Sequence, residues 1–477
     1  MSELSRGPEL MEKIVSLCKR RGFVYPGSEI YGGLANSWDY GPLGVELKNN
    51  IKQMWWKMFV QRRADMVGID AALLMNPKVW EATGHVATFC DPLVECGFCH
   101  ARSRADHVKT MSKMTEGFGD FINEYWRDPV GTAKAKPEFL MNTSWTCPTC
   151  GKGNELSKTA PRQFNMMLKT WLGPVEDQTA VVYLRPETAQ AMFVDFKNIL
   201  ETSRRRLPFG AAQIGKAFRN EITPGNFIFR QREFEQMEIE YFIKPEEWET
   251  HFEHWVGELK KWLKLIGVKE DRLHYVDISD EDRAFYSKRT VDVEYDYPFG
   301  QKELYGLAYR TDYDLSKHEQ FSGAELKFAD PENQANKIVP HVIEPSFGVD
   351  RTILVALLEA YDEEITDEEI RIVMRFPYWM APVKVAILPL SKKEELSVPA
   401  KEVAQMLREA DLTVEYDETQ SIGKRYRRQD EIGTPLCVTF DFDSLEDKAV
   451  TIRDRDTMEQ VRVPISELVV EIRNRLV

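Results

Sequence analysis

The sequence has few cysteines and no long apolar run, and each absence excludes a class of protein. Seven cysteines in 477 residues are too few, and odd in number, for the disulfide framework of a secreted domain. The N-terminal residues mix charges with apolar positions and contain no signal region, and the chain has no apolar run of about eighteen residues. The sequence therefore predicts a cytoplasmic protein with no membrane partner.

The sequence also lacks an excess of basic over acidic residues. The 77 aspartates and glutamates outnumber the 63 lysines and arginines, and the net charge is −14. This charge excludes a protein that coats nucleic acid through a general positive field, so any nucleic-acid partner must meet a local basic patch. With 43% hydrophobic and 29% charged residues, the composition is that of an ordinary globular protein, and the length predicts about three domains.

The most informative segment that is present spans residues 210–242. Two runs with strand character, Ala211–Glu221 and Phe227–Phe242, flank Thr223-Pro224-Gly225-Asn226, whose proline and glycine favour a turn. The pattern predicts an antiparallel hairpin. Side chains alternate along a strand, so the second strand has one polar face and one face that can enter the core. The polar face holds Phe234, Gln236, Glu238 and Glu240, and the apolar face holds Met237, Ile239 and Tyr241.

Arginines gather around this predicted turn. Arg219, Arg230 and Arg232 carry forked guanidinium groups suited to phosphate oxygens, whereas a solvated hairpin with surface ion pairs is the alternative. A fourth arginine, Arg351, follows a predicted strand and glycine turn over 341–350 and opens an apolar helix. Because the helix dipole opposes a cation in the first turn, we interpret Arg351 as a ligand-binding residue.

Two other basic clusters each allow two interpretations. Arg204–Arg206 ends a predicted helix, where the dipole favours cations, although such a run could also meet a phosphate backbone. Within the C-terminal region, Lys424, Arg425, Arg427 and Arg428 flank Tyr426. In so acidic a chain, we interpret this second cluster as a nucleic-acid contact rather than as a solvated helix face.

Four of the cysteines form two CxxC pairs, Cys96 with Cys99 and Cys147 with Cys150. Paired thiolates at this spacing predict a tetrahedral structural zinc site, and two unlinked turns with free thiols are the alternative. The surrounding segment, residues 90–160, is polar and contains several glycines and prolines between the pairs. We therefore expect a mobile insertion there rather than core.

The remaining patterns indicate the domain organisation. Residues 44–63 predict a helix whose Met and Trp side chains recur at helical spacing, as in a core or a subunit seam. Residues 376–382 are rich in proline and aromatics and predict a linker. Beyond the linker, strands and helices alternate in βαβ order, which predicts a separate small α/β domain.

Two stretches, FRNEITPGNFIFRQREFEQMEIEYF and EPSFGVDRTILVALLEAY, resemble motifs 2 and 3 of the class II aminoacyl-tRNA synthetases. The segments YGPLG, LRPETAQ, ELYGLAYRTDYDL and IGKRYRRQDEIGTPLC are similar to the homodimeric glycyl-tRNA synthetase family. The resemblance runs through most of residues 8–477, weakens between about 107 and 140 within the variable insertion, and does not extend to the CxxC pairs.

This resemblance implies an α+β fold in three parts. Residues 1–375 would form a class II catalytic domain with an antiparallel sheet and the 90–160 insertion. Residues 376–382 would be the linker, and residues 383–477 an α/β anticodon-binding domain. The region 44–77 would supply the seam of a homodimer. The implied reaction joins glycine and ATP into glycyl-adenylate and then passes the glycyl group to the 3′ end of the tRNA for glycine, with Mg²⁺ as cofactor.

The resemblance also implies roles for the motif residues in nucleotide binding. Arg219 would hold the α-phosphate and the substrate carboxylate, Phe234 would stack on adenine, and Arg351 would lie on the opposite face or at the γ-phosphate. Glu303 is the implied Mg²⁺ ligand. The implied catalytic residues are Arg219, Glu221 and Arg351. The implied nucleotide site also contains Asn220, Phe229, Arg230, Gln231, Arg232, Glu233, Phe234, Glu303, Leu304, Gly348, Val349 and Asp350.

The implied glycine site must exclude larger amino acids by steric contact while carboxylates hold the ammonium group. Glu187, Glu238, Glu344 and Ser346 are the implied cage, and Arg104 would close over it. The full implied set is Arg104, Glu187, Phe234, Glu235, Gln236, Met237, Glu238, Glu344, Pro345, Ser346, Phe347 and Gly348. Three alternatives remain open: a class II synthetase for serine or proline, a catalytically silent RNA-binding paralogue, and an unrelated ATP-dependent ligase.

Overall fold

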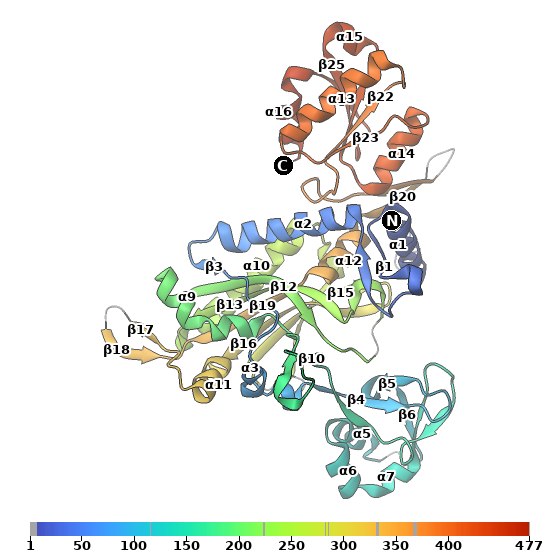
Figure 1. Ribbon diagram of the computed structural model, residues 1–477. Coiled ribbons are helices and arrows are strands. Elements are labelled where there is room, and N and C mark those ends of the chain that lie inside the picture. Colours follow the sequence, from blue (N-terminus) through green and yellow to red (C-terminus); the bar gives the residue numbers. More distant parts are fainter. Residues whose placement is uncertain are drawn as a thin grey trace.

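The computed structural model describes residues 7–114, 116–222, 225–281, 283–284, 286–330, 333–365 and 370–476. Figure 1 shows a central body built on one large sheet, a smaller lobe below it and a C-terminal domain above it. No helix within these described ranges is long and apolar enough to span a bilayer. Two residues of the expected turn, Thr223 and Pro224, lie outside the described residues.

The central sheet has seven strands in the order β14-β15-β16-β19-β13-β12-β3. Neighbours pair antiparallel except at the edge, where β3 runs parallel to β12. The strands are β3 (Met66–Gly68), β12 (Phe209–Phe218), β13 (Glu233–Ile243), β14 (Leu273–Asp277), β15 (Arg289–Tyr297), β16 (Gly300–Thr311) and β19 (His341–Gly348). This antiparallel sheet confirms the predicted fold class.

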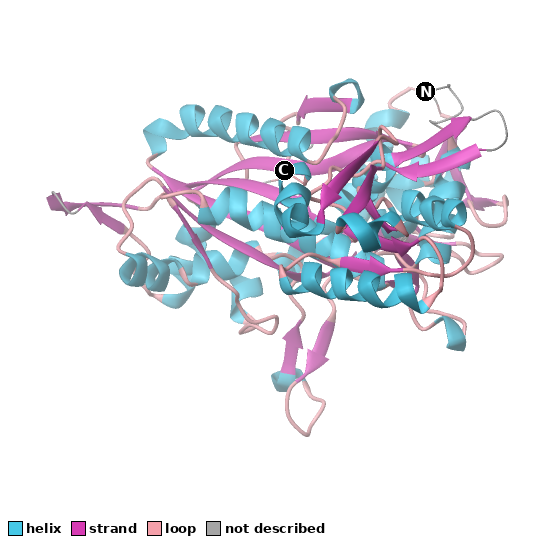
Figure 2. Cartoon of the chain, turned by 90° about the horizontal axis from the view of Figure 1, so that it is seen from above, coloured by secondary structure: helices cyan, strands magenta, loops and turns pink. Residues whose placement is uncertain are grey.

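Helices cover the two faces of this sheet unequally. On one face lies the largest core, where Trp55 and Phe59 meet Trp255, Trp262 and Phe347. The contributing helices are α1 (Pro8–Arg21), α2 (Pro42–Trp56), continued by a π-helical turn Lys57–Gln61, α10 (Trp248–Leu265) and α12 (Val349–Ala360). The view from above in Figure 2 shows the long strands side by side with helices packed over them.

Helices pack over one end of the opposite face. There Phe193, Phe196, Phe209 and Phe242 form a smaller core. The helices are α8 (Ala189–Val194), α9 (Phe196–Ser203) and α11 (Tyr313–Ser322). The short α3 (Lys78–Ala82) contacts α11 and the equally short α4 (His85–Thr88). The other end of this face carries polar side chains, among them Gln236, Glu238 and Glu240 of β13.

Smaller hairpins complete the central body. They are β1 (Val24–Pro26) with β2 (Trp38–Tyr40), β10 (Lys169–Trp171) with β11 (Val181–Tyr183), β17 (Phe328–Asp330) with β18 (Asn333–Ile338), and β20 (Tyr361–Ile365) with β21 (Ile370–Met374). The β17–β18 hairpin projects from one end of the body (Figures 1 and 2).

The predicted hairpin at residues 210–242 is present, with two differences. Its second strand begins at Glu233, because Phe227–Phe229 forms a 3-10 turn that buries its three apolar side chains. Its core face is as expected, since Met237, Ile239 and Tyr241 are buried. However, the polar face is not solvated: Gln236, Glu238 and Glu240 are also buried, under segments that local sequence does not place.

The lobe formed by the insertion has its own core, so the expectation of a segment without core is wrong. Phe121, Tyr125 and Phe139 stack on one another and bury Trp145 with them. Phe121 and Tyr125 are four residues apart and share one face of a helix. The elements are β4 (Cys90–Glu95), β5 (Arg102–Arg104), β6 (Lys109–Ser112), α5 (Phe118–Arg127), α6 (Pro129–Ala135), α7 (Pro137–Asn142), β7 (Thr143–Thr146), β8 (Gly153–Glu155) and β9 (Arg162–Asn165).

The C-terminal region is the expected α/β unit. Its five-stranded sheet has the order β23-β22-β24-β25-β26 around a separate core. The elements are β22 (Val385–Pro389), α13 (Glu394–Glu409), β23 (Val414–Tyr416), α14 (Ile422–Ile432), β24 (Leu436–Phe440), α15 (Asp443–Asp447), β25 (Ala449–Asp454), β26 (Gln460–Pro464) and α16 (Leu468–Arg475).

The predicted linker, residues 376–382, is not an exposed tether. Phe376, Met380 and Ala381 are fully buried in the largest core, and Phe376 lies 6.1 Å from the ring of Phe23. Asn50 of α2 donates hydrogen bonds to the carbonyl oxygens of Met380 and Ala381. Its apolar residues are therefore part of the packing that joins the two bodies.

Candidate active site

A cavity of ≈ 250 Å³ opens near the first residues of β13 and β16 and the last residues of β19. Residues from the predicted hairpin, from β16 and from the β19–α12 junction converge on it, although they are far apart in sequence. Its walls are formed by Arg104, Met166, Arg219, Glu221, Ile228, Phe229, Arg230, Gln231, Phe234, Glu235, Gln236, Glu303, Leu304, Ser346, Gly348, Asp350 and Arg351. Most of the predicted nucleotide site therefore surrounds one cavity.

Among the described residues, no ion-pair partner holds Arg219 in place. Its Nε donates to the carbonyl oxygen of Pro186 at 3.0 Å, and its guanidinium lies 5.3 Å from the ring centre of Phe234 and 5.4 Å from that of Phe89. These contacts orient the group through one backbone oxygen and two aromatic faces. Its remaining N–H donors are suited to an anionic ligand in the cavity.

Glu221 and Arg230 face each other across the same cavity. Glu221 Oε2 lies 3.9 Å from Arg230 Nη1 and, among the described residues, accepts no hydrogen bond although it is buried. A buried carboxylate oxygen without a donor is costly unless a ligand supplies one. This orphaned oxygen is an argument from geometry for a polar ligand at this position.

Arg351 and Glu303 occupy the opposite wall. Arg351 Nη1 lies 3.1 Å from Glu303 Oε2 and donates to the Glu303 carbonyl oxygen at 3.1 Å, and this cation lowers the pKa of the Glu303 carboxyl. The Arg351 guanidinium also lies 4.6 Å from the ring centre of Phe229. In this structure Arg351 therefore faces Phe229, and Phe234 faces Arg219.

Some predicted site residues are committed to other partners. Glu235 pairs with Lys48 at 2.7 Å and with Lys52 at 2.6 Å, so its carboxylate is turned toward α2. Asp350 accepts hydrogen bonds from the Tyr40 hydroxyl and, at 2.9 Å, from the Glu235 backbone N–H. Both carboxylates fasten strand ends to α2 and β2, although their atoms border the cavity.

Arg232 does not join the other arginines, contrary to the prediction of one cluster around the turn. It donates to the carbonyl oxygens of Ala35 and Glu221 and lines a neighbouring hollow with Glu233, which pairs with Lys216 at 2.8 Å. Several further predicted residues also lie outside the cavity wall. Met237, Phe347 and Val349 are fully buried in the core, Pro345 is buried, and Asn220 donates its backbone N–H to Met166.

A group of buried carboxylates lies beside the cavity, on the same face of the sheet. Glu238 of β13 is opposite Ser346 of β19, whose hydroxyl donates to Glu238 Oε1 at 2.9 Å, and the Thr188 hydroxyl donates to Oε2. Glu187 accepts from Gln190 at 2.9 Å and lies 3.4 Å from His85 Nε2. Although burial opposes it, His85 keeps the pKa of Glu187 well below its ordinary value. The predicted cage residues are therefore neighbours.

Arg310 is a central member of this group that sequence reasoning missed. Only 1% of its surface is exposed. It donates to Glu344 at 2.8 Å and to Asp314 at 2.8 and 3.0 Å. A signal was available, because Arg310 and Asp314 stand four residues apart where β16 leads into α11, the spacing of an ion pair on a helical turn.

Glu240 is the second member that was not assigned to the site. It is fully buried, and neither of its carboxyl oxygens has a hydrogen-bond partner in the part of the chain that the structure describes. Burial and the neighbouring Glu344 raise its pKa well above the ordinary value, and burial also raises the pKa of Glu344, against the pull of Arg310. Glu344 accepts a hydrogen bond from Arg310 and Glu240 has no donor, so burial favours the neutral form of Glu240 more strongly than that of Glu344.

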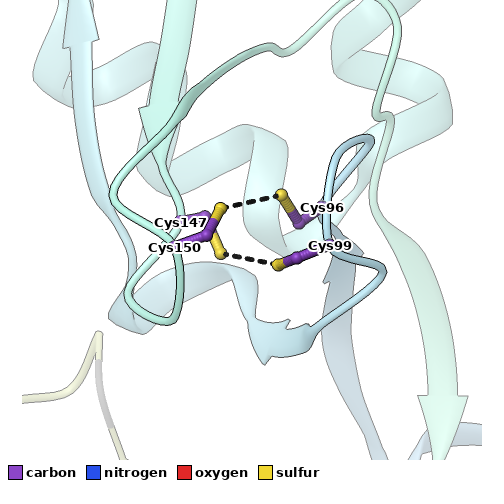
Figure 3. Close-up of side chains that lie close together, drawn as sticks. All are labelled: Cys96, Cys99, Cys147 and Cys150. Atoms are coloured by element: carbon purple, nitrogen blue, oxygen red, sulfur yellow. Dashed lines mark hydrogen bonds between the residues drawn. The ribbon is translucent and has the colours of Figure 1, made fainter.

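The two CxxC pairs meet in the insertion lobe (Figure 3). Cys96 Sγ lies 3.7 Å from Cys150 Sγ, Cys99 Sγ lies 3.7 Å from Cys147 Sγ, and all four sulfurs are within 4.8 Å of one another. A disulfide requires about 2.05 Å, whereas sulfurs at the corners of a zinc tetrahedron with Zn–S near 2.3 Å are about 3.8 Å apart. Although burial opposes it, backbone N–H groups of Cys99 and Phe98 lower the pKa of Cys96 to about 6.

The two basic clusters differ in their surroundings. Arg204 is the C-cap of α9, so the helix-end position of Arg204–Arg206 is confirmed. On α14, only Lys424 of the predicted patch is exposed. Arg425 is buried and donates to the carbonyl oxygens of Pro389 and Asp417, and Arg428 pairs with Asp417. Two of the four cations thus turn to acceptors that local sequence does not reveal, and nucleic-acid contact by this cluster stays a prediction.

Comparison with known proteins gives two family matches. Residues 174–361 match the tRNA synthetase class II core domain of the G, H, P, S and T type, and residues 384–475 match an anticodon binding domain. The chain is 54% identical over 459 residues to the glycine–tRNA ligase of Acetivibrio thermocellus, covering 96% of each chain. It is 52% identical to that of Alkaliphilus oremlandii, covering 98% of each, and 54% identical to that of Clostridium acetobutylicum, covering 96% of this chain and 97% of the relative.

Proposed function

This chain belongs to the glycine–tRNA ligase family of class II aminoacyl-tRNA synthetases, and we propose that the cavity at the ends of β13, β16 and β19 is where it activates glycine with ATP. The activity is that of an ATP-dependent ligase that joins glycine to tRNA. The first step is attack of the glycine carboxylate on the α-phosphorus of ATP, with pyrophosphate as leaving group. Such a step depends mainly on position and on charge stabilisation.

The nucleotide lies in the cavity, with its phosphates among Arg219, Arg230 and Arg351. Arg219 binds the α-phosphate and the attacking carboxylate, because its free donors face the cavity from a position fixed by Pro186. Phe234 stacks on adenine, and Phe229 supports Arg351 from behind. Glu303 is the residue that fits Mg²⁺, a cation that prefers oxygen ligands and that neutralises triphosphate charge when bound.

Glycine lies between this nucleotide and the buried carboxylates. Glu238 and Ser346 hold its ammonium group, with Glu187 and Glu344 behind them, and Arg310 fixes the Glu344 carboxylate. Arg104, which reaches the cavity from the insertion lobe, closes over it. An amino acid with a side chain would clash with this cage or leave its buried polar groups without hydrogen-bond partners. The site therefore selects glycine by excluding larger amino acids. Among the other predicted residues, Gln236 and Gly348 border the cavity.

One observation carries this proposal: three arginines line a cavity directly beside a buried group of carboxylates on adjacent strands. The first set suits a triphosphate and the second suits a small ammonium substrate. The test is aminoacylation of total tRNA with each of the twenty amino acids, alongside amino-acid-dependent pyrophosphate exchange. We expect glycine alone to support both reactions. Exchange with serine or proline at a comparable rate would overturn the assignment of the cage.

The three parts of the chain divide the remaining work. Residues 1–375 form the catalytic domain with its 90–160 insertion, residues 376–382 join it to the rest, and residues 383–477 bind the anticodon region of the tRNA for glycine. Two chains assemble through the 44–77 region, where α2 and the edge strand β3 lie. Sedimentation of the purified protein tests this last point, and a monomer at micromolar concentration would refute it.

The four cysteines of the insertion bind structural zinc. The argument is the sulfur geometry, which matches a zinc tetrahedron and is too wide for disulfides. The lobe contains a small core of its own, and a metal bound by β4 and β7 ends would fasten its two halves. Metal analysis of the purified protein tests this site, and a zinc content near zero would refute it.

A further inference from the structure

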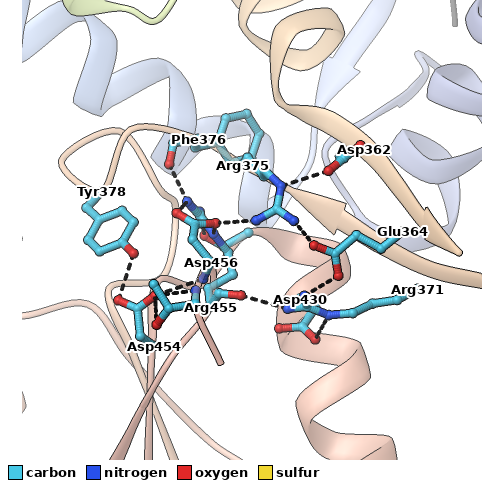
Figure 4. Close-up of polar contacts among 12 residues, drawn as sticks. Asp362, Glu364, Arg371, Arg375, Phe376, Tyr378, Asp430, Asp454, Arg455 and Asp456 are labelled. Atoms are coloured by element: carbon cyan, nitrogen blue, oxygen red, sulfur yellow. Dashed lines mark hydrogen bonds and ion pairs between the residues drawn. The ribbon is translucent and has the colours of Figure 1, made fainter. Parts of the chain in front are cut away.

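The joint between the catalytic body and the C-terminal domain is built from buried, charged side chains. The hairpin β20–β21 follows α12 directly, and its second strand packs against α14 of the C-terminal domain. Figure 4 shows the hydrogen bonds and ion pairs that arginines from both sides of this joint make with acidic side chains and main-chain oxygens. Helix α12 carries Arg351 in its first turn, so one helix of about 18 Å separates this joint from the cavity.

Arg371 of β21 is the first element of the joint. It is fully buried and donates to Asp430 of α14 at 2.8 Å, to Glu364 of its own hairpin at 2.6 Å and to the carbonyl oxygen of Arg455 at 2.7 Å. Asp430 also accepts a hydrogen bond at 3.0 Å from Arg453 of β25. One buried carboxylate thus lies between a guanidinium of the catalytic body and a guanidinium of the C-terminal domain.

Arg455 makes the reciprocal connection. It is 1% exposed and donates to the carbonyl oxygen of Phe376 at 2.8 Å and to that of Gly433, the C-cap of α14, at 2.9 Å. Gly433 is itself in close contact with the catalytic body. A Cβ there would lie 2.5 Å from the Phe376 ring and 2.8 Å from the Met374 carbonyl oxygen, in a left-handed conformation with φ of 81°.

Two more contacts surround this centre. Arg375 donates at 2.8 Å to Asp362 of β20 in its own hairpin, and at 2.8 Å across the joint to Asp456 of the C-terminal domain. Arg21 of α1 pairs with Glu431 of α14. Displacing one partner of a buried ion pair is strongly destabilising, because the other charge remains desolvated without a counter-charge. Rotation of the C-terminal domain would displace several such partners at once, so this network favours one orientation of the two bodies.

We propose that Arg371 and Arg455 are positioning residues for the tRNA-dependent step of the reaction. They hold the C-terminal domain at a fixed orientation to the cavity, so that a tRNA bound by that domain places its 3′ end at the glycyl-adenylate. They do not touch glycine or ATP, and glycine activation does not depend on them. This inference rests on the proposed function of the cavity and of the C-terminal domain.

The test separates the two half-reactions in the full-length protein with Arg371→Gln. Glycine-dependent pyrophosphate exchange should stay within about twofold of wild type, while kcat/KM for tRNA in aminoacylation should fall by about tenfold or more. The matched control is Arg462→Gln. Arg462 pairs with Asp441 and Asp447 inside the C-terminal domain and does not cross the joint, so both reactions should remain near wild type.

A second variant tests the pair rather than the residue. Asp430→Asn should reproduce the selective loss of tRNA charging, and the double variant with Arg371→Gln should lose less than the sum of the two single effects. Charging by Arg371→Gln at the wild-type rate, or equal loss of exchange and charging, would overturn the inference. Failure of the wild-type protein itself to charge tRNA would instead overturn the function proposed for the whole chain.

Discussion

Arg351 and Glu303 neutralise each other across the mouth of the cavity, with Arg351 Nη1 3.1 Å from Glu303 Oε2. Glu303 lies on β16 and Arg351 in the first turn of α12, and each is assigned to a different part of the nucleotide. In the proposed complex this ion pair must separate, because Arg351 turns to the nucleotide and Glu303 to its cation. In the free protein the two charges thus compensate each other, and in the proposed complex contacts with ATP and its cation replace this ion pair.

The first prediction compares two arginines of the two class II motifs, Arg351 and Arg232. Arg351→Ala should lower glycine-dependent pyrophosphate exchange by about a hundredfold or more, the usual cost of removing one charge-stabilising donor. Arg232→Ala should cost much less, because Arg232 donates to Ala35 and Glu221 carbonyl oxygens and lies outside the cavity. Steady-state exchange kinetics measure both. An Arg232 variant as damaged as the Arg351 variant would contradict the placement of the triphosphate.

The second prediction concerns the carboxylate cage. Glu344→Ala should abolish activation of glycine while the affinity for ATP changes little, because Glu344 lies among the buried carboxylates and not in the nucleotide wall. Exchange kinetics and ATP binding to the same preparation measure the two effects. Glu359→Ala is a control at another buried glutamate, one that pairs with Arg272 away from the cavity. Exchange close to wild type in Glu344→Ala would rule out the cage role.

The third prediction is a pH dependence of stability. Because the folded-state pKa of Glu240 is raised well above its unfolded value, folding takes up a proton at neutral pH. The stabilisation is complete below the unfolded pKa of about 4.3 and is lost progressively as pH rises toward the folded value, at up to about 1.4 kcal/mol per pH unit. Glu240→Gln cannot ionise, so its thermal midpoint should fall less steeply than that of wild type between about pH 5 and pH 8. Parallel curves for the two proteins would show that Glu240 is ionised.

The fourth prediction tests the cysteine cluster by metal exchange. Replacing the bound metal with Co²⁺ should produce the intense visible absorption of tetrahedral thiolate coordination, and chelation should lower the melting temperature of the protein. Cys96→Ser should remove the Co²⁺ spectrum. Cys90→Ser should keep it, because Cys90 lies in the same lobe but outside the cluster. A wild-type protein with no Co²⁺ spectrum would refute the metal site.

Sequence reasoning placed the residues whose role follows from a local pattern. The antiparallel pairing of β12 and β13, the strand–glycine–helix unit that presents Arg351, and the CxxC turns depend on neighbours in the chain, so their patterns were sufficient. Arg310 was missed because Glu344, its second acceptor, lies 34 residues away on another strand. The alternation of side chains along the strand placed Glu240 on the correct face. This pattern does not show that Glu240 lacks a hydrogen-bond partner among the described residues.

Three segments differ from what their composition indicates, for a shared reason. Residues 376–382 have the composition of a linker, yet Phe376 and Met380 bury in the largest core. The insertion is polar on average, yet Phe121 and Phe139 stack into a core of their own. Arg425 belongs to a basic run, yet it turns inward to carbonyl oxygens. In each case composition describes the average of a segment, whereas burial depends on which few side chains find partners elsewhere.

The sequence by itself determined the class II motifs, the order of the catalytic and C-terminal parts, and the thiols that can bind a metal, because each is encoded by residue type at short spacing. Only the tertiary structure decided which side chains converge. It brought Glu187, Glu238, Glu344 and Arg310 together, turned Arg232 away from the cavity, and interlocked Arg371 with Asp430 across the joint. The physical reason is that these contacts join segments far apart along the chain, so no local pattern encodes them, and only tertiary packing sets their distances.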